Sequence, residues 1–423
     1  MSTPKHVHHR VGEWLPKDHR FLESWLDKKI QTVHERDRSP EEFHPVIQEF
    51  QQLIETNPEL YMVFHQMFEE IPNKPPYNDD PTGKPQVRDY MTMLRLFDLI
   101  ITEAPSFEDG KFVAVPVAAI LDWPMGTAGG LTAFMDPRVN LMLHKMFDVW
   151  ASFLTSSNSR YVLTTETHGW FGPSATAAIP NFPDTFICDP DAQYHGFKSW
   201  DDFFTRRFRD GVRPVQFPDN DSIVNAACES TVYNIASDIK AIDKFWLKGE
   251  PYSLNHMLHG DPLAPKFVGG TLFQGFLSAL NYHRWHSPVN GKIVKTVMVP
   301  GTYYAESPAL GFSAPEGPDP SGLNRSQSFL TTVAARALIF IEATNPKIGL
   351  MCFMAVGMVE VSTCEITVKH GQSVKKGDQL GMFHFGGSTH CLVFRPETKI
   401  TFNPDYPIGA KAPLNAAIAT VDG

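Results

Sequence analysis

The sequence lacks the features that mark secreted and membrane-spanning proteins. Its 423 residues include five cysteines, an odd number without CxxC spacing, so we expect reduced thiols rather than a disulfide framework. The most apolar stretch, residues 112–121, contains Pro116 and is far shorter than the roughly 20 residues of a membrane span. Residues 1–20 carry charges and histidines where a secretory signal would be apolar. These absences predict a cytoplasmic protein without a membrane anchor.

Basic charge is also scarce. Thirty-seven Lys and Arg residues stand against 47 Asp and Glu residues, for a net charge of −10. This balance argues against a nucleic-acid partner held by a basic surface and against docking on an anionic membrane by bulk charge. What the chain does contain is apolar residues, 42% of the total, enough for the cores of two or three ordinary domains or one large one.

Helical periodicity dominates the first part of the chain. Apolar residues recur at the spacing of one helix face over 43–54, 63–68, 93–101 and 139–153. We interpret these stripes as faces that pack on their own core rather than as grooves for a partner. Residues 73–85, rich in Pro, Asn, Asp and Gly, predict a surface loop.

The pattern changes after residue 213. Short runs rich in Val, Ile, Phe and Thr now alternate with Gly, Pro and Asn turns, and predict strands over 292–299, 337–342, 349–361 and 365–369. We therefore predict an α+β fold, in which a helical N-terminal portion packs on a mostly antiparallel β-sheet domain.

The predicted domain division is residues 1–212, mainly helical, and residues 213–423, β-rich. Between the predicted strands, residues 300–326 hold five prolines and four glycines. No helical or strand period survives there, which predicts a long loop. Loops of this length inside a compact domain are either disordered or functional, and as a functional loop we propose this one as a lid over the substrate.

Two histidines stand three residues apart in an aromatic setting. His283 and His286 lie within Asn281–Gly291, just before a turn that leads into a predicted strand. An HxxH pair can ligate zinc, but no third Cys, His or carboxylate stands nearby at ligand spacing, so we expect no metal. The pair then consists either of two structural histidines or of an acid and a base.

A serine and a glutamate complete a possible catalytic set. Ser388 follows Gly386 and Gly387, whose freedom at positive φ lets the backbone approach closely. The GxSxG elbow of esterases does not fit, because His390 stands where its last glycine belongs. Glu229 begins a strand-like run. Glu229, His286 and Ser388 together have the composition of a carboxylate–histidine–serine relay.

Three ordered motifs carry a family resemblance. Residues 282–293, YHRWHSPVNGKI, resemble the YHRxHxPxxG signature of the phosphatidylserine decarboxylase family, and residues 377–389 resemble its GxxLGxFxFGST processing site. Residues 197–208, followed by Arg213-Pro214, resemble its upstream motif of aromatics, acids and a basic pair. Further segments, among them 228–230, 249–254 and 362–365, are similar to the soluble fungal L-tryptophan decarboxylases of the psilocybin-pathway type, a branch without a targeting segment.

The resemblance implies that the enzyme makes its own cofactor. Ser388 would attack the carbonyl of Gly387, so that the chain divides between them into a β chain, residues 1–387, and an α chain that begins with a pyruvoyl group derived from Ser388. Neither pyridoxal phosphate nor a metal would be needed. The resemblance thus implies that the chain is made as a zymogen, which autocatalytic cleavage matures into a carboxy-lyase.

The resemblance also assigns roles to the candidate residues. His286 would be the base for self-cleavage, Glu229 would orient it, and His283 would donate the proton in decarboxylation. Phe385, Gly386, Thr389 and His390, next to the cofactor, would line the substrate pocket. One departure bears on this set: the family usually has Asp within a PxDG-like run where this chain has Glu229.

The resemblance leaves two substrates open. Phosphatidylserine lies in a membrane, and its decarboxylase should show an apolar anchor or a basic interfacial helix; neither is visible in this sequence. A free aromatic L-amino acid, with tryptophan foremost and tryptamine and CO2 as products, is favoured. The remaining readings are a hydrolase with Ser388 as nucleophile and a binding protein that does not process itself.

Overall fold

The computed structural model describes residues 19–71, 87–107, 115–243, 252–311, 326–361, 363–385 and 388–422. The loop predicted over 73–85 and residues 312–325, the centre of the proposed lid, lie outside them. The chain forms two compact units, one of residues 1–180, 197–200 and 302–327 and the other of residues 181–196, 201–301 and 328–423. The boundary expected between residues 212 and 213 thus falls within the second unit.

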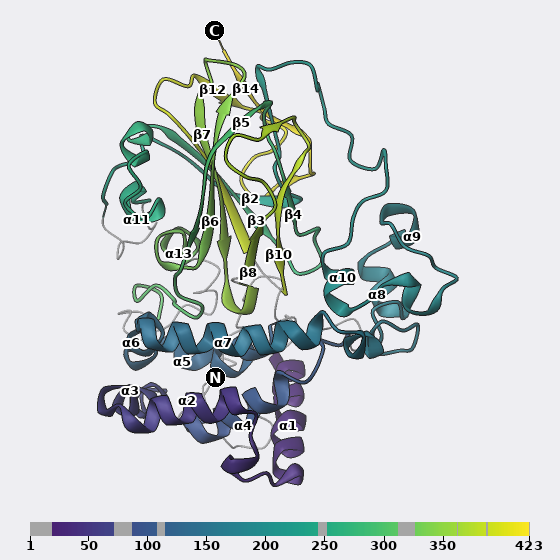
Figure 1. Ribbon diagram of the computed structural model, residues 1–423, viewed down its shortest axis with the longest axis vertical. Helices are drawn as coiled ribbons and strands as arrows, with labels where there is room; N and C mark the ends of the chain where they lie inside the picture. Colours follow the sequence, from purple (N-terminus) through teal and green to yellow (C-terminus); the bar gives the residue numbers. More distant parts are fainter. Residues whose placement is uncertain are drawn as a thin grey trace, which may run out of the picture. The chain divides into compact units, whose positions relative to one another are not determined.

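The first unit is built of helices (Figure 1). They are α1 (His19–Arg36), α2 (Pro45–Thr56), α3 (Pro58–Glu69), α4 (Tyr90–Ile100), α5 (Pro116–Met125), α6 (Ala128–Met135), α7 (Pro137–Leu154) and α8 (Pro173–Ala178). Five of them, α2, α3, α5, α7 and α8, have proline at their first position, where its missing N–H breaks no helical hydrogen bond. The predicted helix faces pack on one core, in which the ring of Phe50 lies 5.9 Å from that of Phe64 and 6.3 Å from that of Phe97.

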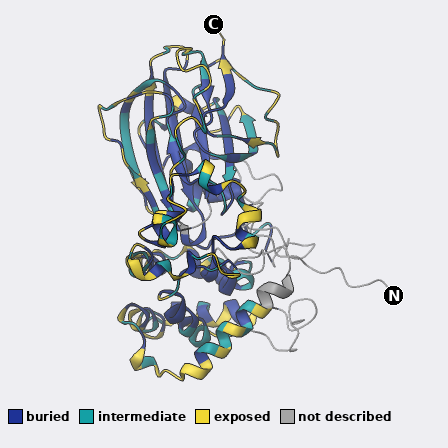
Figure 2. Cartoon of the chain, turned by 90° about the vertical axis from the view of Figure 1, so that its right-hand side faces the viewer, coloured by how far each residue is buried: buried dark blue, intermediate teal, exposed yellow. Residues whose placement is uncertain are grey.

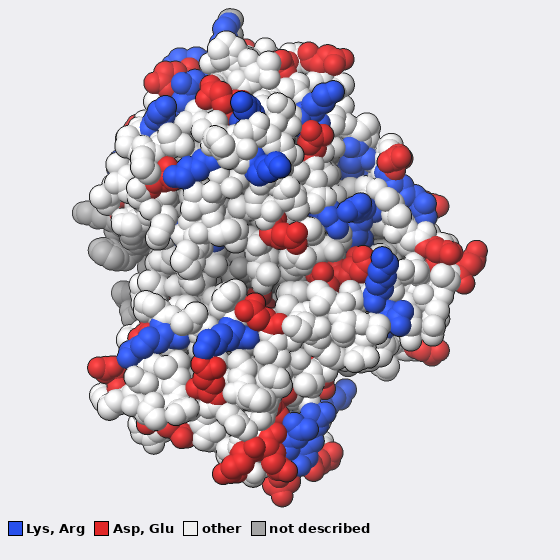
Figure 3. All heavy atoms as spheres, in the orientation of Figure 1, with Lys and Arg blue, Asp and Glu red and all other residues white. Residues whose placement is uncertain are grey.

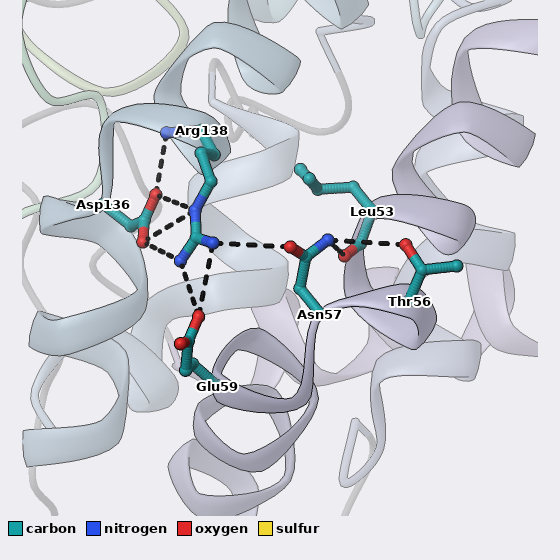
Figure 4. A network of polar contacts seen from close by, with 6 residues as sticks. All are labelled: Leu53, Thr56, Asn57, Glu59, Asp136 and Arg138. Carbon is teal, nitrogen blue, oxygen red and sulfur yellow. Dashed lines mark hydrogen bonds and ion pairs between the residues drawn. The ribbon is translucent and has the colours of Figure 1, made fainter.

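A surface ion-pair network joins two helix junctions of this unit (Figure 4). Arg138, in the first turn of α7, donates to Asp136 at 2.8 Å, to Glu59 at 3.3 Å and to Asn57 at 3.4 Å. Asp136 also caps α7 by accepting from the backbone N–H of Arg138 at 2.7 Å. Because these side chains are largely exposed, each ion pair contributes no more than about 1 kcal/mol.

The second unit is built of antiparallel sheets. Its strands are β1 (Ile223–Asn225), β2 (Ser230–Ser237), β3 (Thr271–Leu277), β4 (Arg284–His286), β5 (Gly291–Val299), β6 (Arg336–Ala343), β7 (Leu350–Gly357), β8 (Thr363–Ile366), β9 (Ser373–Val374), β10 (Gln379–His384), β11 (Ser388–Phe394), β12 (Ile400–Phe402), β13 (Lys411–Ala412) and β14 (Ala417–Val421). The short helices α9 (Phe182–Thr185), α10 (Trp200–Phe204), α11 (Leu254–Met257) and α13 (Gln327–Val333) lie outside the sheets. The predicted α+β class is confirmed.

These strands form one large and two small sheets. The large sheet has the order β13-β2-β3-β11-β7-β6-β5-β9, and the small ones have the orders β4-β10-β8 and β1-β14-β12. Strands β7 and β11, in the middle of the large sheet, are buried at every residue. Figure 2 shows much of the sheet region in the dark blue of buried residues. The near-continuous apolar run of β7 suits burial on both faces, whereas β11 begins with the buried polar residues Ser388, Thr389 and His390.

The β4-β10-β8 sheet packs on one face of the large sheet. Trp285 of β4 is fully buried, and its ring lies 5.5 Å from that of Phe353 in β7. Gly381 of β10 permits this packing, because a Cβ at this position would stand 2.6 Å from the Trp285 ring and 2.2 Å from the backbone oxygen of Glu365. These contacts bring the two predicted motifs, on β4 and β10, together.

Two predicted strands end earlier than expected. The strand predicted over 349–361 ends at Gly357, since Val359 adopts a φ of 54°, which a β-branched residue rarely does. The strand predicted over 365–369 is β8, which ends at Ile366. The five cysteines are free, as expected.

The surface carries charges of both signs. On the face drawn in Figure 3, the described Lys and Arg side chains are interspersed with Asp and Glu. In the part of the chain that the structure describes, no helix is long and apolar enough to cross a membrane.

Candidate active site

Ser388 occupies the first position of the central strand β11. It pairs with Leu277 of β3 on one side and with Gly357 of β7 on the other. The side chain is fully buried, and its Oγ has no hydrogen-bond partner among the described residues. A buried hydroxyl without a partner is costly to the fold. Gly386 and Gly387, before it, lie outside the described residues.

The side chain of Ser388 belongs to the face of the large sheet that β4 covers. Side chains alternate along a strand, so Ser388 shares its face with His390. The His390 ring lies 6.0 Å from that of Phe353, which in turn contacts Trp285 of β4. Trp285 of the histidine motif therefore packs toward the face of the large sheet that carries Ser388.

His286 ends β4 with both ring nitrogens engaged. Its Nδ1 lies 2.6 Å from the carbonyl oxygen of Gly377 and its Nε2 lies 2.9 Å from the hydroxyl of Tyr282. A carbonyl can only accept, so Nδ1 carries the proton and the Tyr282 hydroxyl donates to Nε2. Burial lowers the pKa of His286, against a smaller opposing effect of the bond to Gly377. His286 is thus a neutral imidazole whose basic nitrogen faces a phenol.

His283 is fully buried and stacks on an aromatic ring. The centroid of its imidazole lies 4.2 Å from that of Phe204, with the planes 16° apart. Burial lowers its pKa well below the ordinary value, and the nearby positive charge of Arg206 lowers it further. His283 is therefore neutral at pH 7, and it can deliver a proton as an imidazolium only after taking one up during the reaction.

Glu229 does not hydrogen-bond to His286 in the described part of the chain. Its carboxylate forms a two-point ion pair with Arg213, Nε to Oε2 at 2.9 Å and Nη2 to Oε1 at 2.6 Å, and Oε2 also accepts from the backbone N–H of Leu414 at 2.8 Å. The expected orienting contact is replaced by the carbonyl of Gly377. The Glu229 side chain, one methylene longer than the Asp usual in the family, pairs with Arg213 instead of His286.

An indirect route nevertheless joins Glu229 to His286. The guanidinium of Arg213 lies 4.9 Å from the ring of Phe208, and that ring stacks on Tyr282 at 4.3 Å. Tyr282 then donates to His286. Sequence reasoning missed Tyr282, although it stands in the YHRWH motif itself, four residues before His286.

The remaining candidate pocket residues lie within three positions of Ser388 in the sequence. Phe385 is buried and adopts a φ of 64°, a strained conformation of the kind that clusters at functional sites. Thr389 is fully buried and hydrogen-bonded through its hydroxyl to the carbonyl of Gly275 at 3.0 Å. His390 is fully buried, and burial lowers its pKa to about 4.

His384, the last residue of β10, was not singled out from the sequence. Its Nδ1 lies 2.9 Å from Asp201 and its Nε2 lies 2.8 Å from Glu365. Burial alone would lower the pKa of His384, but its bonds to these two carboxylates outweigh that effect and raise it. An imidazolium between two acids anchors the strand that leads to the Gly-Gly-Ser segment.

Comparisons with known proteins agree with this geometry. A family model described as phosphatidylserine decarboxylase matches residues 200–415, and a second with the same description matches residues 44–179. The decarboxylase iboD of Amanita muscaria is 48% identical over 77% of this chain and 99% of its own. The L-tryptophan decarboxylase of Psilocybe cubensis is 42% identical over 84% of this chain and 81% of its own.

A bacterial relative extends the similarity. The phosphatidylserine decarboxylase proenzyme of Fusobacterium nucleatum subsp. nucleatum is 30% identical over 56% of this chain and 75% of its own. The part of the chain that the family model matches, residues 200–415, contains His283, β4 with His286, and β11 with Ser388. The chain therefore belongs to the phosphatidylserine decarboxylase family of carboxy-lyases.

Proposed function

We propose that the chain is a self-cleaving decarboxylase of free aromatic L-amino acids, with L-tryptophan as the foremost substrate and a pyruvoyl group derived from Ser388 as its cofactor. The observation that carries the proposal is the fully buried Ser388 hydroxyl, unbonded among the described residues, at the head of the central strand. It stands directly after two glycines in a chain of this family.

The surroundings of Ser388 fit such a group. Converting a serine to a pyruvoyl group removes a hydroxyl, and the Ser388 hydroxyl makes no hydrogen bond within the described residues that this conversion would break. The peptide nitrogen of Thr389 would carry the group, with Leu277 and Gly357 on either side. When bound, a pyruvoyl group supplies a ketone that captures an amine and accepts the electrons released as CO2 departs.

The residues support the cleavage chemistry as follows. For this step the Tyr282 hydroxyl must first turn away from Nε2 of His286. Nε2 then takes the hydroxyl proton of Ser388 and passes it to the departing nitrogen, while Oγ bonds to the carbonyl carbon of Gly387 and the peptide C–N bond breaks, leaving an ester and an amine. Loss of the Cα proton of residue 388 then breaks its Cβ–Oγ bond and releases the carboxylate of Gly387. Water finally replaces the nitrogen on residue 388, which leaves as ammonia.

His283 serves the later reaction. Because it is neutral at rest, it can accept a proton from the ammonium group of an arriving amino acid and return a proton to the α-carbon after CO2 leaves. The Phe204 ring, stacked on it at 4.2 Å, fixes the plane of the imidazole. His283 would thus touch the substrate, while His286 serves maturation.

The choice of a free amino acid rests on three points. The Psilocybe relative named L-tryptophan decarboxylase is 42% identical over most of both chains. The net charge of −10 opposes an anionic membrane surface, and the structure describes no helix suited to crossing a membrane. Phosphatidylserine is the competing substrate, because the family model carries its name.

Mass spectrometry and two assays test the proposal. We expect the purified protein to give chains of residues 1–387 and 388–423, the second blocked at its first residue by a pyruvoyl group, and to release CO2 from L-tryptophan. A Ser388→Ala variant should stay in one piece and release none. A single uncleaved chain would refute self-processing, and turnover of phosphatidylserine vesicles but not of tryptophan would refute the substrate.

A further inference from the structure

A chain of buried hydrogen bonds leads to Thr389, next to Ser388. The hydroxyl of Tyr252 donates to Oε1 of Gln274 at 2.6 Å, and Nε2 of Gln274 donates to Oγ1 of Thr389 at 3.0 Å. The Thr389 hydroxyl then donates to the carbonyl of Gly275 at 3.0 Å. At the other end, Nδ2 of Asn234 donates to the Tyr252 hydroxyl at 3.1 Å.

This chain approaches from the face of the large sheet opposite to the histidines. Thr389 alternates with Ser388 along β11 and so points to the other side. Gln274 of β3 pairs with Cys391, two residues beyond Thr389, and with Asn234 of β2, so the three side chains share that face. The network thus contacts Thr389 on one face of the large sheet, and Ser388 lies on the opposite face.

Burial makes the network sensitive to the loss of any member. Gln274 and Thr389 are fully buried, and Tyr252 is 5% exposed. Burial raises the pKa of Tyr252, so its hydroxyl stays protonated and can donate. The donated proton fixes which end of the Gln274 amide faces Thr389. Removing one hydroxyl would leave a buried partner unsatisfied, whereas apolar side chains throughout would cost the fold little.

The position of Thr389 gives the network a purpose. Its peptide nitrogen is the atom that remains bonded to residue 388 when the chain divides after Gly387. A displaced Thr389 would displace both the attacking hydroxyl before cleavage and the group derived from it afterwards. A misplacement of about 1 Å can cost a reaction about a hundredfold.

We propose that Tyr252 and Gln274 are positioning residues, which act through Thr389 to align residue 388 for self-cleavage and for decarboxylation. This inference rests on the proposed function. The inference goes beyond the proposed function because it assigns a role to a polar network on the far face of the sheet. Neither Tyr252 nor Gln274 of that network belongs to the serine and histidine motifs.

Four variants test the network. Thr389→Val keeps the shape of the side chain and loses the hydroxyl, whereas Thr389→Ser keeps the hydroxyl. Tyr252→Phe removes the first donor, and Tyr161→Phe, which removes a hydroxyl bonded to the backbone N–H of Ala104 at 2.9 Å, is the matched control. Self-cleavage is followed on denaturing gels after a pulse of cell-free synthesis, and kcat and KM for tryptophan are measured on the cleaved fraction.

We expect Thr389→Val and Tyr252→Phe to slow self-cleavage about tenfold or more and to lower kcat more than they change KM. Thr389→Ser should restore both rates, and Tyr161→Phe should match the unaltered protein. If the unaltered protein divides and decarboxylates while Thr389→Val and Tyr252→Phe match it, or if Thr389→Ser is as slow as Thr389→Val, the inference is overturned and the proposed function stands. If the unaltered protein does not divide, both fall.

Discussion

The hydroxyl of Tyr282 donates a hydrogen bond of 2.9 Å to Nε2 of His286, the nitrogen to which the proposed function gives the role of base. The carbonyl of Gly377, 2.6 Å from Nδ1, fixes the opposite end of the ring. The imidazole is thereby held in one tautomer and one plane without a carboxylate. In serine proteases an aspartate holds Nδ1 and leaves Nε2 free, whereas here a turn carbonyl holds Nδ1 and a phenol occupies Nε2.

The first prediction is the pH dependence of self-cleavage. Burial lowers the pKa of His286 below its ordinary value of 6.5, and the base works only when deprotonated. The cleavage rate should therefore fall as the pH is lowered and His286 takes up a proton, with a midpoint below pH 6.5. Gel time courses from pH 5 to pH 8 measure this. A midpoint above pH 6.5 would contradict the assignment of His286 as the base.

The second prediction concerns Tyr282→Phe. The substitution keeps the ring, which stacks on Phe208 at 4.3 Å, but removes the hydroxyl that stabilises the neutral form of His286. The pKa of His286 should rise toward its ordinary value, so the midpoint of the cleavage profile should move to higher pH. The same time courses, with Tyr161→Phe as a control that leaves the midpoint in place, measure the shift. An unchanged midpoint would mean that Tyr282 has no influence on the base.

The third prediction separates two roles for Glu229. If Glu229 acts through its ion pair with Arg213, then Arg213→Gln should slow self-cleavage about as much as Glu229→Gln, and the double variant should be little worse than either single one. If Glu229 oriented His286 directly, Arg213→Gln would have little effect. Each single change leaves a half-buried charge without its partner and should also lower stability by about 1–3 kcal/mol.

The control for this comparison is the exposed network of the first unit. Arg138→Gln breaks an ion pair of the same type, with Glu59 at 3.3 Å and Asp136 at 2.8 Å (Figure 4). Because it lies at the surface and outside the second unit, we expect self-cleavage to proceed at the unaltered rate. Cleavage rates of the four variants, measured side by side with their melting temperatures, distinguish a local effect from a general loss of stability.

The sequence predicted the larger features well, for a physical reason. Helices such as α2 and α7 bury one stripe each, and strands such as β5 and β6 are bounded by turn residues, so periodicity alone identifies them. Strand ends were less predictable. Nothing in the sequence Met-Val-Glu-Val after Gly357 indicates that Val359 adopts a left-handed φ, because that conformation is imposed by the surrounding fold.

The site shows the same division. Ser388, His283 and His286 stand in short motifs, and the histidine motif is brought against the large sheet by the pairing of β4 with β10 and the packing of Trp285 on Phe353. The partner of Glu229 could not be predicted, because Arg213 lies 16 residues away and an acid near a histidine is the simpler expectation. The network behind Thr389 was equally hidden, since Tyr252 and Gln274 resemble ordinary sheet residues until their side chains are placed.

The last prediction concerns His384 and the pH dependence of stability. The bonds to Asp201 and Glu365 raise the pKa of His384 above its ordinary value of 6.5. A raised pKa in the folded protein gives stability that is fully present below pH 6.5 and is lost as the pH rises through the folded value. His384→Gln, which cannot titrate, should remove this part of the dependence. Melting temperatures between pH 5.5 and pH 8.5 should therefore fall less steeply with rising pH in the variant than in the unaltered protein.

The control is His65→Gln, which should keep the original slope. His65 is exposed, and among the described residues its hydrogen bond is to the carbonyl of Tyr61. Equal slopes for His384→Gln and the unaltered protein would mean that the imidazole is not charged between its two carboxylates.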